Sequence, residues 1–214
     1  DNNFEAYLES NGMGDGNIAN DSVLTQAIDT LGTLDISNQF IYDLTGIQDF
    51  RDLYILNCSN NNVISLNLSQ NTNLGFLYCS FNLLTSLDIS QNNNLHSLSC
   101  SDNLLSSLNI NGAVSITNLY CGNNQLTSLN ATQNPVLRRL RCNGNQLLTL
   151  DLRNGNINWD TLSTWVNFTS NPNLYCINVD DSTWATNNWT VANGNIGTNQ
   201  YFSTNCSNII YGCT

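Results

Sequence analysis

The side chains that could carry acid–base or nucleophilic chemistry are few and lie far apart in the sequence. The one histidine, His96, stands in a strand-like segment, residues 95–99, with its side chain predicted to face outward. A Ser/His/Asp relay would need a buried acid and an oxyanion hole beside it, and the sequence marks neither. Asp88, Asp102 and Asp151 are single acids without the paired spacing that acid–base catalysis uses. Phosphate loops, zinc motifs and nucleophile elbows are also missing, so we predict no enzymatic activity, no catalytic residue and no cofactor.

The cysteines are the next candidates for chemistry, because the 214 residues include eight of them. Five recur every 21 residues, at Cys58, Cys79, Cys100, Cys121 and Cys142. Equivalent side chains on stacked strands lie about 4.8 Å apart and point the same way, whereas a disulfide needs Cβ atoms about 3.8 Å apart and turned toward each other. Tetrahedral metal binding needs four converging ligands, which a linear column does not provide. We therefore predict that these five cysteines are reduced, buried and structural.

Loops 14–17 and 180–181 carry oxygen ligands that calcium could use, but neither matches the twelve-residue calcium loop. We interpret both as solvated loops and predict no metal site.

The elements that must position these cysteines repeat with the same 21-residue period. Three residues after each cysteine stands an asparagine, at Asn61, Asn82, Asn103, Asn124 and Asn145. Further apolar columns recur five, eight and ten residues after each cysteine. Self-similarity at a fixed period of 20–29 residues is typical of a leucine-rich-repeat solenoid. An asparagine side chain carries both a donor and an acceptor, so we predict that this column satisfies the inward-facing backbone groups of each corner.

Each repeat contains two short apolar-x-apolar pieces, such as residues 77–79 and 87–89. They divide the repeat into two half-turns of about ten residues, each with a strand and a corner. We therefore predict two short parallel β-ladders, one on each side of a narrow coil, with leucine and cysteine inside and the intervening residue outside.

The run Leu-x-x-Leu-x-Cys-x-x-Asn-x-Leu-x-x-Leu-Asp/Asn-Leu/Ile resembles bacterial leucine-rich repeats of the 21-residue type called IRREKO, over roughly residues 53–152. An earlier 22-residue unit, beginning at Leu34, looks more like a generic leucine-rich repeat. The resemblance implies a secreted or cell-surface protein of the kind common in Bacteroidota.

A solenoid needs caps, since each end would otherwise expose its core. Residues 1–33 suit an N-terminal cap, with Phe4, Tyr7 and Leu8 at helical spacing, and residues 34–155 form the solenoid. Residues 156–208 form a C-terminal cap, in which we predict a helix across 159–166 and another after Asp180-Asp181-Ser182. All four tryptophans lie in this cap, where we expect them to cover the solenoid end; a sugar-stacking platform is the alternative.

The C-terminal segment also resembles the closing segment of many secreted proteins of this group. That resemblance implies a Cys176–Cys206 disulfide that holds the cap and requires an oxidising compartment. Cys213 is then left over, so we interpret residues 209–214 as the start of a following linker or module, and the chain as part of a larger protein or a monomer.

Charge sets limits on the partners. The chain has 5 Lys+Arg against 16 Asp+Glu, a formal net charge of -11, which repels nucleic acid and anionic membranes. No stretch approaches the roughly 20 apolar residues of a membrane helix, so we predict no membrane insertion. A surface rich in Asn, Ser and Thr but poor in charge suggests an extracellular protein.

Function is best sought on the outward columns of the two ladders. The cysteine-side strands vary from rung to rung and mix aromatics with arginine, as binding hot spots do, and supply the ligand-binding candidates Phe76, Tyr78, Tyr120, Arg139 and Arg141. The opposite ladder is a uniform column of Ser, Asn and Asp. The alternative is that both are plain surface. The arginines 138, 139, 141 and 153 could meet a carboxylate or sulfate, or pair with Asp151 and Asp160.

We therefore predict a non-catalytic extracellular binding or adhesion module that recognises a protein or polysaccharide through the cysteine-side sheet. The alternative is a structural spacer or self-associating fibre segment of a larger cell-surface protein. An ice-binding face on the Ser/Asn ladder is a minor variant, weakened by its aspartates.

Overall fold

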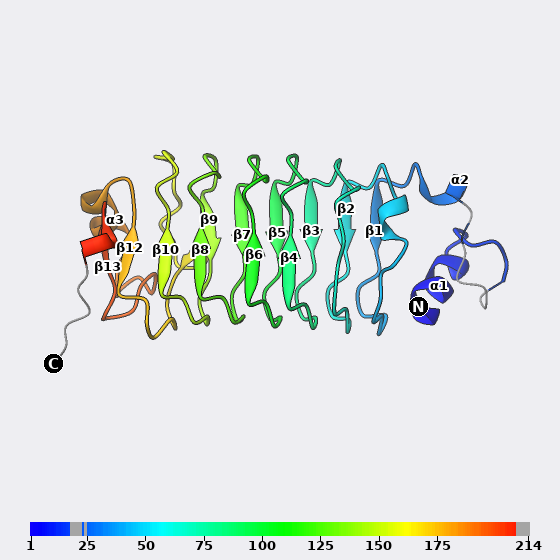
Figure 1. Cartoon of the computed structure of the whole chain (residues 1–214), viewed down its shortest axis with the longest axis horizontal. Helices are drawn as coiled ribbons and strands as arrows, with labels where there is room; N and C mark the ends of the chain where they lie inside the picture. Colours follow the sequence, from blue (N-terminus) through cyan, green and yellow to red (C-terminus); the bar gives the residue numbers. More distant parts are fainter. Residues whose placement is uncertain (18–22, 24, 209–214) are drawn as a thin grey trace.

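A computed structural model describes residues 1–17, 23 and 25–208 of the chain. The predicted solenoid is confirmed: the chain winds into an elongated coil, with the N-terminal helix at one end and the last helix at the other (Figure 1). The predicted module start at 209–214, including Cys213, lies outside the described residues.

The cysteine-side sheet is the continuous element of the fold. Its seven parallel strands are β1 (Thr33–Asp35), β2 (Ile55–Asn57), β3 (Phe76–Tyr78), β5 (Ser97–Ser99), β7 (Asn118–Tyr120), β9 (Arg139–Arg141) and β11 (Val166–Asn167). From β1 to β9, leucines equivalent in the repeat face each other across each pair, as Leu77 faces Leu98, and in the last pair Leu140 faces Val166. The strands are only two or three residues long, so stacking of successive coils, not strand length, holds the sheet together.

The second predicted ladder is present on the opposite side of the coil, but it is divided into two separate sheets. One part joins β4 (Ser86–Asp88) to β6 (Ser107–Asn109), and the other joins β8 (Ser128–Asn130), β10 (Thr149–Asp151), β12 (Cys176–Asn178) and β13 (Tyr201–Ser203). Residues 65–67 form no strand. The break follows β6, in the coil where Gly112 lies so close to the preceding coil that a Cβ would stand 1.7 Å from the Ser90 carbonyl oxygen.

The core is one dry column of apolar side chains. All five ladder cysteines are free and fully buried, as predicted. Burial raises the pKa of the Cys58 and Cys121 thiols to about 12, because a thiolate would lose its hydration there. The ladder thiols are therefore protonated and unreactive near neutral pH.

A spine of asparagines fastens each coil to its neighbours. In Asn82, which illustrates the column, Nδ2 donates to the Cys79 carbonyl of its own coil (3.1 Å) and to the Cys58 carbonyl of the preceding coil (2.9 Å). Its Oδ1 accepts from the backbone N–H of Val63 (2.9 Å). The predicted structural role is confirmed in the equivalent bonds of Asn61, Asn103, Asn124 and Asn145, and Asn171 adds a sixth member.

A second asparagine column, Asn71, Asn92 and Asn134, lies at the other corner and is less completely bonded. Nδ2 of Asn92 donates to the Leu68 and Asn71 carbonyls (3.1 and 2.9 Å). The Oδ1 atoms of all three are buried and have no partner among the described residues. Ala113 occupies the equivalent place in the coil that contains the ladder break.

The N-terminal end carries helix α1 (Asn2–Ser10), capped by the Asp1 side chain, which accepts from the Asn3 and Phe4 N–H groups. Its buried side chains include Phe4 and Leu8, as the helical spacing predicted. Two further short helices follow, α2 (Thr25–Ile28) and the 3₁₀ helix η1 (Ile47–Asp49).

The predicted helix across 159–166 is wrong: a turn at Leu162 leads into β11, because Val166 pairs with Leu140 and continues the cysteine-side sheet. The second predicted helix is present as α3 (Ser182–Asn188), capped by Asp181, and the 3₁₀ helix η2 (Cys206–Asn208) follows β13. Strands β11, β12 and β13 thus extend both sheets into residues 156–208. The start of the C-terminal cap at residue 156 stays a prediction.

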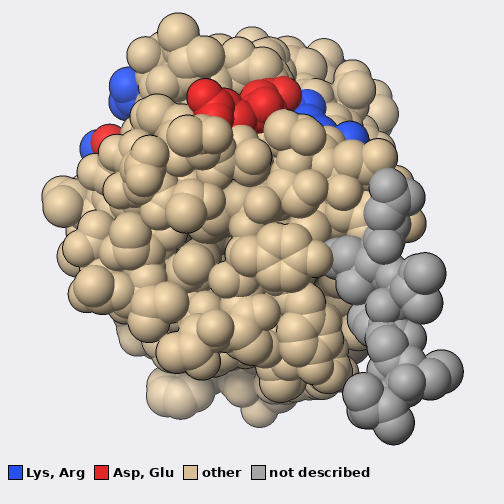
Figure 2. All heavy atoms as spheres, turned by 90° about the vertical axis from the view of Figure 1, so that its left-hand side faces the viewer, with Lys and Arg blue, Asp and Glu red and all other residues tan. Residues whose placement is uncertain are grey.

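Three of the four tryptophans cover the solenoid end. Trp189 is 1% exposed and meets Trp159 and Trp184 edge to face, with ring centroids 5.3 and 5.2 Å away. Seen from this end, the surface is largely uncharged, with its acidic side chains gathered near one rim (Figure 2). Trp165 is not part of this cluster.

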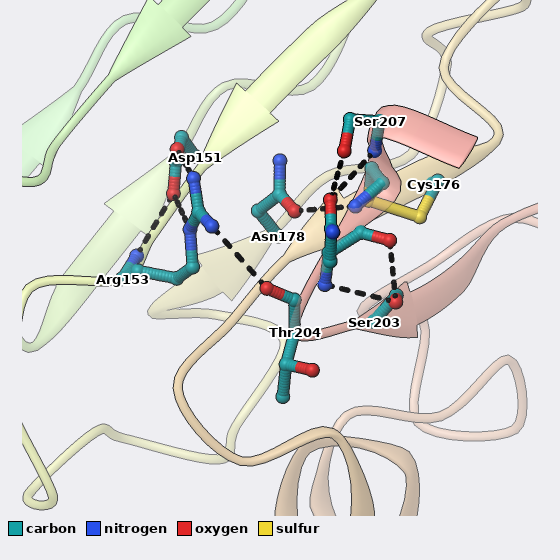
Figure 3. Close-up of a disulfide and its surroundings, with 9 residues drawn as sticks. Asp151, Arg153, Cys176, Asn178, Ser203, Thr204 and Ser207 are labelled. Atoms are coloured by element: carbon teal, nitrogen blue, oxygen red, sulfur yellow. Dashed lines mark hydrogen bonds and ion pairs between the residues drawn. A yellow bond between two sulfur atoms is a disulfide. The ribbon is translucent and has the colours of Figure 1, made fainter. Parts of the chain in front are cut away.

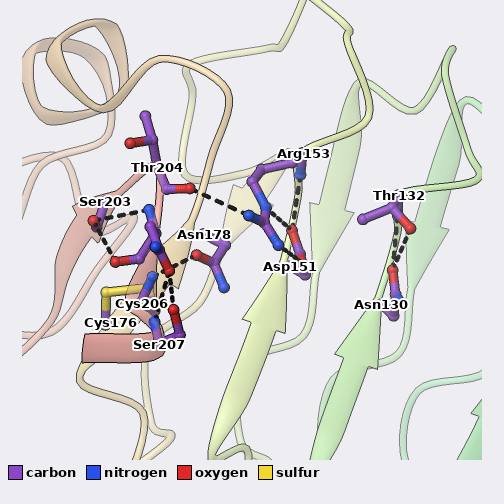
Figure 4. A network of polar contacts seen from close by, with 11 residues as sticks. Asn130, Thr132, Asp151, Arg153, Cys176, Asn178, Ser203, Thr204, Cys206 and Ser207 are labelled. Carbon is purple, nitrogen blue, oxygen red and sulfur yellow. Dashed lines mark hydrogen bonds and ion pairs between the residues drawn. A yellow bond between two sulfur atoms is a disulfide. The ribbon is translucent and has the colours of Figure 1, made fainter. Parts of the chain in front are cut away.

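The Cys176–Cys206 disulfide is present and joins β12 to η2, with Cα atoms 5.8 Å apart (Figure 3). Beside it, Asn178 Oδ1 accepts from the Cys206 N–H (2.8 Å). Arg153 binds Asp151 through Nε and Nη2 (2.9 and 2.5 Å) and reaches the Thr204 carbonyl through Nη1 (3.2 Å; Figure 4). The hydrogen bonds of Arg153 lower the pKa of the Asp151 carboxyl, and the group ties the last coils together.

Candidate ligand-binding groove

Two outward columns run along the cysteine-side sheet, because alternate residues of each strand point away from the core. Strand pairing places Phe76, Ser97, Asn118 and Arg139 in one column, and Tyr78, Ser99, Tyr120 and Arg141 in the other. Large side chains in the second column therefore stand on either side of the small Ser99. The predicted outward orientation of His96 is also confirmed, since it is exposed beside this sheet.

A longer coil brings a tryptophan into this surface. Asn171 follows Asn145 by 26 residues, whereas earlier members of the spine are 21 apart. The extra residues lie between β10 and β11 and carry Asp160 and Trp165. Because Val166 pairs with Leu140, Trp165 takes the place beside Arg139 in the first column. The Arg139 guanidinium carbon lies 4.2 Å from the Trp165 ring centroid, and its Nε donates to Asp160 Oδ2 (2.5 Å).

The corner after each cysteine-side strand adopts a left-handed conformation two residues beyond the cysteine. Asn60, Asp102, Asn123 and Gly144 occupy it in four coils, with φ between 53° and 67°, and these residue types tolerate that region. In the remaining coil the residue is Phe81, with φ 56° and 56% of its surface exposed. A bulky residue there costs strain, of order 1–3 kcal/mol, without gaining burial, which marks Phe81 as a functional candidate.

These features border one groove along the carboxyl ends of the cysteine-side strands. Its volume is about 360 Å³, within the roughly 300–1,000 Å³ typical of ligand sites. Its lining comprises Ser80, Phe81, Ser99, Ser101, Asp102, Tyr120, Gly122, Asn123, Arg141, Asn143, Thr164 and Trp165. Hydroxyl, amide and carboxylate groups thus form the floor, and aromatic rings stand at both ends.

The charges in and beside the groove differ in how far they are compensated. The ion pair with Asp160 raises the pKa of Arg139, so that cation is held and neutralised. Arg141 is exposed, and within the described part of the chain its side chain makes no ion pair or hydrogen bond. Asp102 accepts a hydrogen bond from Asn123 Nδ2 (2.9 Å). Burial raises the pKa of Tyr120, so its hydroxyl is protonated and can donate.

The five residues predicted as ligand-binding candidates are not all brought together. Tyr120 and Arg141 line the groove, whereas Arg139 is outside its lining and packs against Trp165. Phe76 instead stacks with His96 (6.2 Å between ring centroids) on the same sheet, outside the groove lining. Tyr78 is 37% exposed and also lies outside that lining.

Sequence reasoning missed Trp165 as part of this surface, because its spacing was interpreted as helical. For the arginines, the sequence left open whether they meet an anionic ligand or pair with nearby aspartates. Two of them pair with aspartates: Arg139 with Asp160, and Arg153 with Asp151. Across the described residues, no group of three or more His, Cys, Asp or Glu could hold a metal ion. Nor does any helix in them have the length and apolarity to cross a membrane.

The fold and its roughly 21-residue turns define a leucine-rich-repeat solenoid, and solved structures agree. The internalin InlF from Listeria monocytogenes superposes with a TM-score of 0.58 at 17% identity, over 83% of this chain and 55% of that one. The leucine-rich-repeat domain of APL1B gives a TM-score of 0.51 at 16% identity, over 72% and 44%.

The functional domain of InlJ from Listeria monocytogenes, described as including a cysteine ladder, is 27% identical over 75% of this chain and 46% of that one, with a TM-score of 0.42. The chain spans about half the length of these structures. No protein-family model and no curated protein matches the chain.

Proposed function

We propose that this chain is a non-catalytic, extracellular binding module of the adhesion type, which holds its ligand against the cysteine-side sheet. The observation that carries this proposal is the groove, in which an uncompensated arginine and a strained, exposed phenylalanine stand on a surface otherwise made of small polar groups. Aromatic and arginine side chains dominate the energetics of binding surfaces. Neither Phe81 nor Arg141 contributes to the core, so the fold alone does not explain them.

The rest of the molecule supports this assignment. The opposite ladder repeats one polar pattern, in which an Asp or Asn side chain accepts from the N–H two residues later, as in the Asp88–Ser90 and Asn130–Thr132 turns. A face whose side chains are engaged in their own turns offers less to a partner than a varied one. The disulfide fits an oxidising compartment, in agreement with a secreted or surface location, and we infer that the array is of the bacterial 21-residue type.

A binding screen against immobilised glycans and candidate protein ligands tests the proposal. We expect the double variant Tyr78→Ala/Tyr120→Ala to lose at least tenfold in affinity for the ligand found. The matched control, Ser86→Ala/Ser107→Ala on the opposite ladder, should bind as the parent does. Equal binding by both double variants would place the site elsewhere.

The alternative is a spacer or self-associating segment, which the uniform opposite ladder favours. Sedimentation velocity at increasing concentration separates the two functions. Filaments that form without any ligand, and that the opposite-ladder variant prevents, would support the alternative and contradict the binding proposal.

A further inference from the structure

We propose that the groove is a subsite for a single carboxylated sugar residue of a saccharide ligand, with Arg141 as the group that binds the carboxylate. This inference rests on the proposed binding function and names the ligand class for it. The argument combines the charge of Arg141, the two aromatic ends of the groove and the hydroxyl-rich floor between them.

The charge points to an anionic group on the ligand. The chain carries 16 acidic against 5 basic residues, yet Arg141 lacks a carboxylate partner among the described residues although its neighbour on the same strand, Arg139, has one. Its planar guanidinium offers two parallel N–H donors that match both oxygens of a carboxylate. Because Tyr120 lies beside it in the groove and keeps its proton, a hydroxyl donor can add a further bond to the same anion.

The aromatic rings indicate a ligand with flat apolar faces. Trp165 is 37% exposed, and one face of its ring packs against the Arg139 guanidinium, a contact that restricts the ring before a ligand arrives. Phe81 projects from the corner after β3, and Trp165 precedes β11, four strand spacings or roughly 19 Å along the solenoid. A sugar ring presents apolar C–H groups on its faces and can pack against such a ring while its edges stay polar.

The floor supplies partners for those polar edges. The Ser80 and Ser99 hydroxyls lie 2.9 Å apart and share one hydrogen bond, so both can accept from a third hydroxyl and one of them can still donate to it. Asp102 uses one oxygen for Asn123 and keeps the other as an acceptor. The combination of one cation, neutral hydroxyls and a single acceptor carboxylate suits a sugar acid with several free hydroxyls.

A protein ligand fits the groove less well. A peptide that adds to a sheet needs an open strand edge, but β5, β7 and β9, which supply Ser99, Tyr120 and Arg141, are each hydrogen-bonded on both sides. A peptide side chain that docks by burial needs an apolar pocket, whereas most groups that line this groove are polar. The observations therefore favour the saccharide over the polypeptide.

Isothermal titration of the intact chain with uronic-acid oligosaccharides tests the inference, with the fully methyl-esterified oligosaccharide of equal length as the matched ligand control. We expect the free acid to bind and the ester, which keeps the rings and hydroxyls but loses the charge, to bind at least tenfold more weakly. Equal binding of acid and ester would overturn the role of the carboxylate. Binding only of a sulfated oligosaccharide of equal length would overturn the carboxylate as the recognised group.

Protein variants locate the site. We expect Arg141→Gln to lose at least tenfold in affinity for the uronide, and Arg138→Gln, an equal change in charge at an exposed arginine outside the groove, to lose less than twofold. Equal losses in both arginine variants would reduce the effect to overall charge and contradict the site.

Two negative results have different meanings. If uronides do not bind but another ligand binds and is lost in Tyr78→Ala/Tyr120→Ala, the sugar-acid inference is wrong and the binding module stands. If no ligand binds the cysteine-side face at all, both proposals fail. Circular dichroism of each variant confirms that it remains folded.

Discussion

Replacing Asn103 with alanine should destabilise the solenoid strongly, because this side chain bonds three buried backbone groups at once. Its Oδ1 accepts from the Leu84 N–H (3.0 Å), and its Nδ2 donates to the Cys79 and Cys100 carbonyls (3.0 and 3.1 Å). A buried group left unsatisfied costs about 1–3 kcal/mol, with an N–H more severe than a carbonyl that keeps a second lone pair. About 2 kcal/mol for the N–H and about 1 for each carbonyl gives a loss of about 4 kcal/mol.

The second asparagine column provides an internal comparison. Asn92→Ala frees only two carbonyls, and it also removes an Oδ1 that is itself buried without a partner in the described structure. We expect its cost to be about 1–2 kcal/mol, clearly below that of Asn103→Ala. The exposed Asn109→Ala, in the same coil as Asn103, should cost less than about 0.5 kcal/mol.

Equilibrium unfolding in guanidinium chloride, followed by circular dichroism, measures these differences as shifts of the midpoint at a common slope. If Asn103→Ala came within 1 kcal/mol of Asn109→Ala, the spine would not be the fastening we describe. If Asn92→Ala cost as much as Asn103→Ala, the difference between the two columns would be refuted.

Two further predictions concern the cysteines. Folding raises the pKa of the Cys58 and Cys121 thiols to about 12, so their stabilising contribution is complete below the unfolded pKa near 9 and is lost as the pH rises from there toward 12. Above pH 9, the free energy of unfolding of Cys121→Ala should therefore fall by about 1.4 kcal/mol less per pH unit than that of the parent, as measured by chemical unfolding. An equal pH dependence of the two unfolding free energies would contradict the buried-thiol assignment. The disulfide closes a 30-residue interval, for which chain entropy gives about 3.5 kcal/mol; Cys176→Ser/Cys206→Ser should lose about this much, and a reductant should lower the parent to the same stability without affecting the variant. A reductant that also destabilises the double variant would show that another sulfur bond contributes.

The periodic part of the chain could be predicted because every rung repeats the environment of the last. A cysteine column that is too straight for metal and too widely spaced for disulfides can only be a buried column, and the structure has it so. The structural role of the asparagine spine could be predicted in the same way, because the backbone groups of each corner need both a hydrogen-bond donor and an acceptor. The break after β6 and the close approach of the Gly112 backbone to the preceding coil did not follow from the repeat pattern.

The groove was less predictable because it depends on the coil that departs from the period. The spacing of Trp159, Leu162 and Trp165 matches a helical face, but pairing of Val166 with Leu140 overrides that local preference. Trp165 and Asp160 then join Arg139, a contact that no local pattern encodes. Tyr120 and Arg141 could be placed in advance because strand alternation alone decides which way they face.

The spine also determines how such an array can change its length. Within the regular repeats, Asn82, Asn103, Asn124 and Asn145 each donate to the cysteine carbonyl that lies 24 residues earlier, in the coil before. Duplication or loss of a whole 21-residue unit would therefore rejoin equivalent partners, whereas an insertion of one residue in a corner would separate them. The long coil between Asn145 and Asn171 accommodates its extra residues only between the two sheets. Gene duplication could thus extend the solenoid by about 4.8 Å per unit while the end that carries Trp165 stays unchanged, so that reach and recognition can evolve separately.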